Sequence, residues 1–148
     1  MKTLLVPIDF SPATSSVLEE AVRLAKALAA EVILMHPTQP PIVASDYGLA
    51  VENVQEIVAV TEKHANTQLA HSLSTLEKQE IKVRVHHCHG SAISCIVDYA
   101  KEQAADYIIM GSHGHSAIYD LLVGSTTHGV LQDACCPVII VPASTGQT

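Results

Sequence analysis

The chain of 148 residues carries 15 acidic and 8 basic side chains, a net charge of −7 with histidine neutral, and this balance argues against non-specific binding to nucleic acid or anionic membranes. No apolar run approaches the ~20 residues of a membrane-spanning helix. A composition of 48% hydrophobic but only 3% aromatic residues predicts an aliphatic core, and we expect one soluble cytoplasmic domain over residues 1–148 without a signal peptide.

Apolar runs and helical periodicity alternate through the first half of the chain. The first run ends at Asp9, and Ser11 followed by Pro12 predicts a helix start, because serine caps helices and proline suits the first helical position. The predicted elements are, in order, a buried strand over 3–8, a helix to about Ala30, a strand over 31–36, a proline-bearing loop over 37–50 and a long helix over 51–79.

The second half continues this alternation. Residues 81–87 alternate apolar and polar side chains, which predicts a strand with one wetter face near the sheet edge. The elements predicted after it are a loop over 87–91, a helix marked by apolar residues from Ile93 to Ala100, a strand over 107–110, a helix over 125–132 and a strand over 138–141. Strands that alternate with helices predict an α/β fold, a parallel sheet with right-handed crossovers.

One stretch, residues 110–127, joins an apolar strand to a glycine-bearing loop and a helix start. Glycines let backbone N–H groups approach an anion closely, and a helix N-terminus adds unpaired donors with partial positive charge. The stretch therefore predicts a phosphate site, with a glycine turn before a capped helix as the alternative. Its pattern is Gly-x2-Gly-x9-Gly-Ser, at Gly111, Gly114, Gly124 and Ser125.

This motif, lying after a hydrophobic strand and before a final aliphatic strand, resembles the nucleotide-binding signature of the universal stress protein family. The opening residues 6–11 (Val-Pro-Ile-Asp-Phe-Ser) are similar to that family's first strand and its acidic end. Residues 135–142 (Cys-Cys-Pro-Val-Ile-Ile-Val-Pro) are similar to its last strand. The resemblance covers essentially the whole chain, and it implies a Rossmann-like (adenine nucleotide alpha hydrolase-like) fold of five strands in the order 3-2-1-4-5, with helices on both faces.

In that strand order the chain reverses direction between strands 1 and 4. A ligand therefore belongs outside the carboxyl ends of these strands. Those ends carry Asp9 and Gly111, which are far apart in sequence. Two distant motifs thus meet at one crevice, and their meeting favours a nucleotide site.

The resemblance implies roles for individual residues in binding ATP, ADP or AMP. Backbone N–H groups around Gly114 and Ser125 would hold the phosphates, and Mg²⁺ would bridge phosphate oxygens. Asp9 would approach the ribose or adenine, or would instead cap the first helix, while Ile8 and Met35 would be apolar walls for the base. The expected nucleotide-binding residues, none of them catalytic, are Pro7, Ile8, Asp9, Met35, Pro37, Met110, Gly111, His113, Gly114, Gly124, Ser125 and Thr126.

One position departs from the family pattern. The residue after the second-strand histidine, His36, commonly offers adenine both a backbone N–H and a C=O. Here that residue is Pro37, which has no N–H. We therefore expect weaker or less selective adenine recognition in a pocket that is otherwise retained.

The resemblance implies a nucleotide-binding stress regulator or switch with at most slow ATP hydrolysis. The motif loop offers only Asp120 and histidines beside the phosphates, and none of them stands out as a dedicated general base. The resemblance also implies a homodimer formed through the last strand, Val138–Val141, and an exposed aliphatic edge strand gives a physical reason for that pairing. The chain carries no motif that points to a particular protein target.

Other functions fit the sequence less well. A related nucleotidyltransferase or ATP pyrophosphatase would carry a histidine motif or a Ser-Gly-Gly loop soon after the first strand, where this chain has Phe10-Ser11-Pro12. A flavodoxin-like electron carrier would need aromatic residues to sandwich its flavin. A dimeric family member that binds no nucleotide and acts through protein contacts lacks the glycine motif, which this chain keeps.

Histidines and cysteines are the remaining candidates for site chemistry. Residues 86–89 (His-His-Cys-His) are consecutive, and alternation along a strand lets at most two of them converge. We therefore expect solvated histidines there in preference to a zinc site, which usually takes four ligands in spaced pairs. The four cysteines, at positions 88, 95, 135 and 136, show no Cys-x-x-Cys spacing, and we expect reduced thiols.

Overall fold

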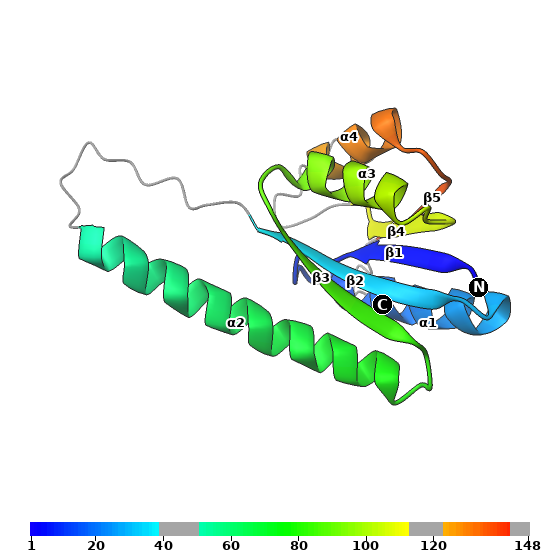
Figure 1. The fold of residues 1–148 in the computed structure, drawn as a ribbon, viewed down its shortest axis with the longest axis horizontal. Coiled ribbons are helices and arrows are strands. Elements are labelled where there is room, and N and C mark those ends of the chain that lie inside the picture. The colour runs from blue at the N-terminus through cyan, green and yellow to red at the C-terminus, as the bar shows by residue number, and fades with distance from the viewer. Residues whose placement is uncertain (39–50, 113–122, 143–148) are drawn as a thin grey trace, which may run out of the picture.

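The computed structural model describes residues 1–38, 51–112 and 123–142. Five parallel strands form a sheet in the order β3-β2-β1-β4-β5, the Rossmann-like α/β arrangement predicted above (Figure 1). The strands are β1 (Thr3–Pro7), β2 (Glu31–Thr38), β3 (Val83–His89), β4 (Tyr107–Gly111) and β5 (Val138–Val141). The helices are α1 (Thr14–Leu28), α2 (Val51–Glu77), α3 (Ala92–Glu102) and α4 (Ser125–Asp133).

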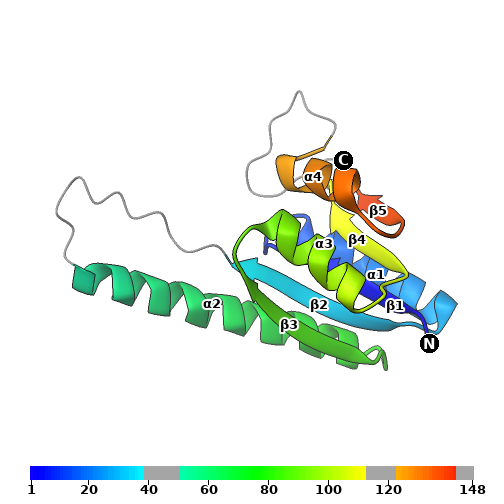
Figure 2. The same cartoon turned by 45° about the horizontal axis from the view of Figure 1, so that its top comes forward.

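Helices cover both faces of the sheet, α1 and α2 on one face and α3 and α4 on the other (Figures 1 and 2). Successive side chains of a strand point to opposite faces, so Leu4 of β1 packs in one core with Val17 and Leu76, while Leu5 packs in the other with Ile96. Burial on both faces explains why the central strands are unbroken aliphatic runs.

The outer parts of the fold are less covered. The residues of β3 are half-buried or exposed, with none fully buried, and the strand lies at one edge of the sheet, which confirms its predicted position. Helix α2 extends past the sheet in Figure 1. In its second half Leu69 and Leu76 are buried, whereas Ile57 and Val60 nearer its start are 58% and 68% exposed.

Helix α1 begins later than predicted. The N–H of Ser11 donates to Asp9 Oδ1 at 2.9 Å, and the N–H of Thr14 donates to the Ser11 carbonyl at 3.0 Å. These bonds form a turn in which Phe10 takes a left-handed φ of 59°. The predicted cap at Ser11 is therefore wrong, because the turn uses its polar groups, and Ala13 is the N-cap residue.

Strand β2 is two residues longer than predicted. Pro37 and Thr38, expected in the loop over 37–50, pair in register with Cys88 and His89 of β3. The remainder of that predicted loop lies outside the described residues.

Proline fits within β2 because adjacent residues of a parallel strand bond to opposite neighbours. The carbonyl of Met35 accepts from the N–H of Ile8 on the β1 side, at 2.8 Å. The carbonyl of Thr38 accepts from Gly90 on the β3 side, at 2.9 Å. Pro37 therefore faces the β1 side beyond the end of β1, where no strand requires its missing N–H.

A disulfide joins Cys88 of β3 to Cys95 of α3, so the expectation of reduced thiols is wrong for this pair. The intervening turn, with Gly90 at a φ of 120°, folds the helix start back onto the strand end. It leaves the two Cα atoms 6.1 Å apart, within the range of about 4.4–6.8 Å that disulfides span. Cys135 and Cys136 are free thiols, as expected.

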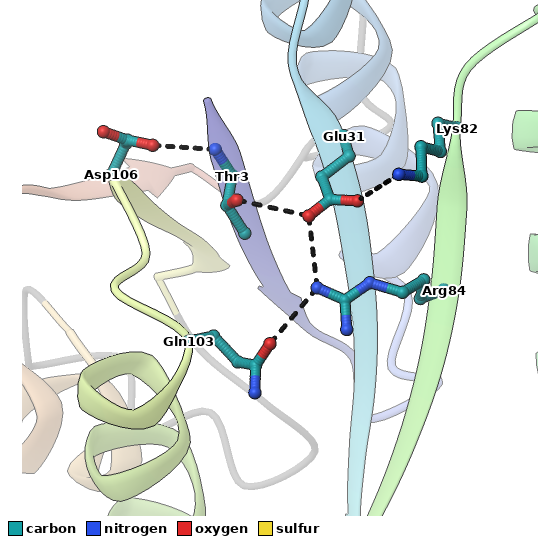
Figure 3. Close-up of polar contacts among 6 residues, drawn as sticks. All are labelled: Thr3, Glu31, Lys82, Arg84, Gln103 and Asp106. Atoms are coloured by element: carbon teal, nitrogen blue, oxygen red, sulfur yellow. Dashed lines mark hydrogen bonds and ion pairs between the residues drawn. The ribbon is translucent and has the colours of Figure 1, made fainter. Parts of the chain in front are cut away.

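A polar network ties three strands together at their amino ends (Figure 3). The carboxylate of Glu31 accepts from Thr3 Oγ1 at 3.3 Å and from Arg84 Nη2 at 3.1 Å, and it lies 3.4 Å from Lys82 Nζ. Arg84 also donates to Gln103 at 3.2 Å. Burial alone would raise the pKa of Glu31, but Arg84 and Lys82 outweigh that effect and hold the pKa below its ordinary value.

We expect Glu31→Gln to lower the free energy of unfolding by about 1–2 kcal/mol at neutral pH, because the amide keeps the shape but loses the charge-assisted bonds. Since the folded-state pKa is lowered, this stabilisation is present above the unfolded-state pKa and is lost as pH falls through the folded value. Urea unfolding from about pH 5 to about pH 3 should show the two proteins converging. The exposed Glu77→Gln is the control, and a difference independent of pH would contradict this account.

Candidate functional site

A crevice lies at the carboxyl ends of β1 and β4, where the strand order reverses. This is the place at which the topology predicts a ligand. The crevice has a volume of about 230 Å³. The residues that line it are Pro7, Ile8, Asp9, Ser11, Ala13, Thr14, Val17, Pro37, Ala92, Ile96, Met110, Gly111, Gly124, Ser125, Thr126 and Thr127.

Most of the residues expected in a nucleotide site are brought together here. Met35 is different: it is fully buried in the core under α3 and α4 and is not among the lining residues. His113 and Gly114 lie outside the described residues. The expected residues that line the crevice are Pro7, Ile8, Asp9, Pro37, Met110, Gly111, Gly124, Ser125 and Thr126.

The β1 side of the crevice is fixed by backbone and imidazole contacts. His36 Nδ1 lies 3.0 Å from the Ile8 carbonyl, and its ring packs against Phe10 with centroids 4.6 Å apart. Asp9 is exposed at the crevice and bonds to the N–H of Ser11. Its carboxylate therefore supports the turn before α1, a role close to the helix capping given above as the alternative to ligand binding. Asp9 also lines the crevice.

The β4 side is fixed by hydrogen bonds between the strand end and α4. The N–H of Gly124 donates to the Ser112 carbonyl at 2.6 Å, and the buried Thr127 hydroxyl donates to the Gly111 carbonyl at 2.9 Å. These bonds hold the first turn of α4 at the crevice. Gly124, the N-cap residue, has extended backbone and no side-chain cap bond. The first N–H groups of a helix have no partner within it, so this turn offers donors and partial positive charge.

Pro37 contributes an acceptor without a donor. Its position in β2 directs its backbone toward the β1 side, and it lines the crevice. The wall beside it consists of Ala92 and Ile96 from α3, which sequence reasoning missed. The apolar spacing of α3 indicates a core helix, and its placement against the crevice depends on packing that no local signal encodes.

The α1 side of the crevice and one threonine in the first turn of α4 are also absent from the expected site residues. Thr14 and Val17 lie in the first turn of α1 and line the crevice. Thr127 follows Ser125 and Thr126, which were both expected to line the site, and carries a hydroxyl like theirs. In the structure this hydroxyl bonds the Gly111 carbonyl.

The histidine and cysteine run at the end of β3 is engaged in other contacts. His86 stacks on Tyr99 with ring centroids 3.7 Å apart, and burial is the main cause of its lowered pKa. His89 Nδ1 lies 2.7 Å from the Thr38 hydroxyl, while Cys88 is in the disulfide. Within residues 1–38, 51–112 and 123–142, no three His, Cys, Asp or Glu side chains gather to hold a metal ion.

Membrane insertion of a helix finds no support in the part of the chain that the structure describes, where no helix combines the length and apolarity that spanning a bilayer requires.

Comparison with known proteins identifies one family. The model of the universal stress protein family matches residues 1–142. Universal stress protein A homolog 2 of Coxiella burnetii is 32% identical, over 95% of this chain and 94% of its own. The structure of protein MJ0577 of Methanocaldococcus jannaschii is similar with a TM-score of 0.81 and 28% identity, over 98% of each chain. A universal stress protein from Archaeoglobus fulgidus in complex with dAMP has a TM-score of 0.69 and 22% identity, over 95% of this chain and 98% of its own.

The bond between Thr127 and Gly111 makes a prediction about how α4 is held. Thr127→Val keeps the side-chain shape but leaves the Gly111 carbonyl without this donor, so we expect the free energy of unfolding to fall by about 1–2 kcal/mol. Urea unfolding measures the change. Thr126→Val, at the neighbouring half-buried position, should cost less than about 0.5 kcal/mol. An equal loss at both positions would show that the Thr127 bond has no special role.

Proposed function

This chain belongs to the universal stress protein family, and from that premise we propose that its crevice binds an adenine nucleotide, ATP, ADP or AMP, as the switch of a stress-response regulator. The observation that carries the proposal is the meeting of two distant segments at the strand reversal. Asp9 follows β1, Gly124 and Ser125 begin α4, and all three line one crevice. The A. fulgidus relative holds dAMP; at 22% identity it supports the fold, and an adenine ligand enters here as part of the proposal.

The start of α4 is the proposed phosphate end of the crevice. The groups there are the first backbone N–H groups of the helix and the hydroxyls of Ser125 and Thr126. Residues 123–127 include no carboxylate, so this donor set fits an anionic group. Mg²⁺ would be held through phosphate oxygens.

The opposite end of the crevice is the proposed site of the base and ribose. Ile8, Met110 and Ile96 give it apolar walls, and Asp9 offers a carboxylate oxygen to ribose hydroxyls. Pro37 offers its carbonyl to the adenine amino group but no N–H to a ring nitrogen. Adenine is therefore held by one backbone bond where two are possible.

We favour a binding switch with at most slow hydrolysis over an efficient ATPase. Asp9 is the carboxylate among the described lining residues, and its bond to the N–H of Ser11 supports the turn. A group committed in this way is poorly suited to activate water, because a general base must accept a proton. The proposed regulator acts in the cytoplasm on a protein target.

Assembly into a homodimer through β5 is part of the proposal. β5 is an edge strand, and each of its residues from Val138 to Val141 is half-buried. An aliphatic strand at the edge of the described sheet favours association with a second copy. A dimer that acts through protein contacts without nucleotide is the alternative, and the next experiment separates the two.

Titration calorimetry with ATP and magnesium tests the site. Gly124 has φ −71° and ψ 168°, a conformation open to any residue, so Gly124→Val should fold while its side chain obstructs the approach of phosphates. We expect saturable binding to the wild type and at least a tenfold loss in the variant, about 1.4 kcal/mol. Ala27→Val adds methyl groups at an exposed position in the last turn of α1 and should bind normally. No binding to the wild type would favour the nucleotide-independent dimer.

A second titration tests Pro37. Pro37→Ala restores a backbone N–H on the β1 side, and one added hydrogen bond should strengthen ATP binding by roughly 2–10-fold and increase the preference for ATP over GTP. Pro137→Ala, at the amino end of β5, is the matched control. Unchanged selectivity in Pro37→Ala would show that the missing N–H does not limit adenine recognition.

A further inference from the structure

One pair of cysteines lies beside the crevice and has no part in the proposed nucleotide contacts. Cys88 stands near the end of β3 and Cys95 in the first turns of α3, and a disulfide joins them. Cys95 is only 7% exposed, whereas Cys88 is half-buried. A small thiol therefore reaches the disulfide through Cys88.

Each end of this disulfide is attached to the crevice wall. On the strand side, Cys88 pairs in register with Pro37 of β2. On the helix side, Cys95 is followed directly by Ile96. Pro37, Ile96 and Ala92 all line the crevice. The disulfide thus links α3 to β3, and β3 in turn pairs with β2. These elements shape this side of the site.

The turn between the cysteines holds the strand end better than the helix start. Thr38 accepts from the N–H of Gly90 at 2.9 Å, and its hydroxyl donates to the Cys88 carbonyl at 3.3 Å. Ser91, the N-cap residue of α3, makes no side-chain cap bond. An uncapped helix start frays readily, so the disulfide adds a covalent restraint to a first turn that is otherwise held by the packing of Ile93 against Gly129 of α4 and by the buried Ile96.

The reduced pair also fits the surrounding structure. The carbonyl oxygen of His89 lies 3.9 Å from Cys88 Sγ and 3.7 Å from Cys95 Sγ. Each thiol formed on reduction has this weak acceptor within reach. The turn therefore already supplies an acceptor that either thiol can use once the pair opens.

We propose that Cys88 and Cys95 are a thiol–disulfide modification site that sets the nucleotide affinity of the crevice, an inference that rests on the proposed function. The closed pair holds the α3 wall in place before the ligand arrives. Nucleotide binding then loses less conformational entropy, because the start of α3 is already ordered. Opening the pair releases that wall and weakens binding.

The chemistry is exchange with a small-molecule thiol. Its thiolate attacks the Cys88 sulfur, the S–S bond breaks, and Cys95 leaves as a thiolate that takes up a proton. A second thiol attacks the mixed disulfide, which releases the small-molecule disulfide and leaves Cys88 as a thiol. In the reverse direction the small-molecule disulfide is the oxidant, and it is reduced to two thiols as the pair closes.

The test is calorimetry with ATP and magnesium on protein treated with oxidised glutathione and on protein treated with dithiothreitol, with thiols counted by alkylation and mass. We expect reduction to weaken ATP binding by about fivefold. Cys88→Ser, which cannot close the pair, should show the weaker affinity under both treatments. Cys135→Ser/Cys136→Ser should keep the full response, because these free thiols precede β5 at its amino end. Cys95→Ser repeats the test from the buried partner.

Three other outcomes would overturn either this inference or the proposed function. Equal ATP affinity in the closed and open forms would overturn this inference and leave nucleotide binding in place. Four alkylated cysteines after the oxidising treatment would overturn it too, because the pair then fails to close. Absence of ATP binding in both forms would overturn the proposed function, and this inference with it.

Discussion

Burial of the central strands between two helix layers is the constraint on which the rest of this structure depends. Leu4, Leu5 and Val6 of β1 are completely buried, and so are Val32 to Met35 of β2. An unpartnered polar side chain along these strands would be costly, since polar groups removed from water require hydrogen-bond partners. Polar chemistry is therefore displaced to the two ends of the sheet. The amino ends hold the structural network around Glu31, and the carboxyl ends hold the crevice.

The two ends use different kinds of interaction. At the amino ends, the carboxylate of Glu31 in β2 is met by Arg84 of β3, by Lys82 just before β3 and by the Thr3 hydroxyl of β1, and these contacts connect strands β1 to β3. At the carboxyl ends, short contacts dominate: backbone N–H groups, the Thr127 hydroxyl and the turn at Asp9. Short contacts leave the crevice open while fixing its walls. This division is consistent with a sheet that is stabilised at one end and available for recognition at the other.

The strands and helices were predictable from sequence because their signals are local: aliphatic runs, helical spacing and a glycine motif. The strand order and the place of the crevice required the family resemblance in addition. The errors occur where a residue's role depends on a distant segment. Ser11 does not cap α1, because its N–H and carbonyl are bonded within a turn that Asp9 supports. Pro37 continues β2 because β1 has already ended beside it. Met35 lies near the carboxyl end of β2, beside the site, but its side chain is buried in the core. Cys88 and Cys95 pair through a turn whose shape no spacing rule describes.

Helix α2 illustrates how unevenly one element can be supported. Isolated helices are marginal in water, and most helical stability in proteins comes from packing an apolar face. Leu69 and Leu76 give the second half of α2 such a face, while Ile57 and Val60 extend into solvent. The amide protons near Leu76 therefore report on global unfolding of the domain, and those between Ile57 and Val60 report on local helix–coil exchange. A single helix thus spans two cooperative units, one shared with the sheet and one governed by its own propensity.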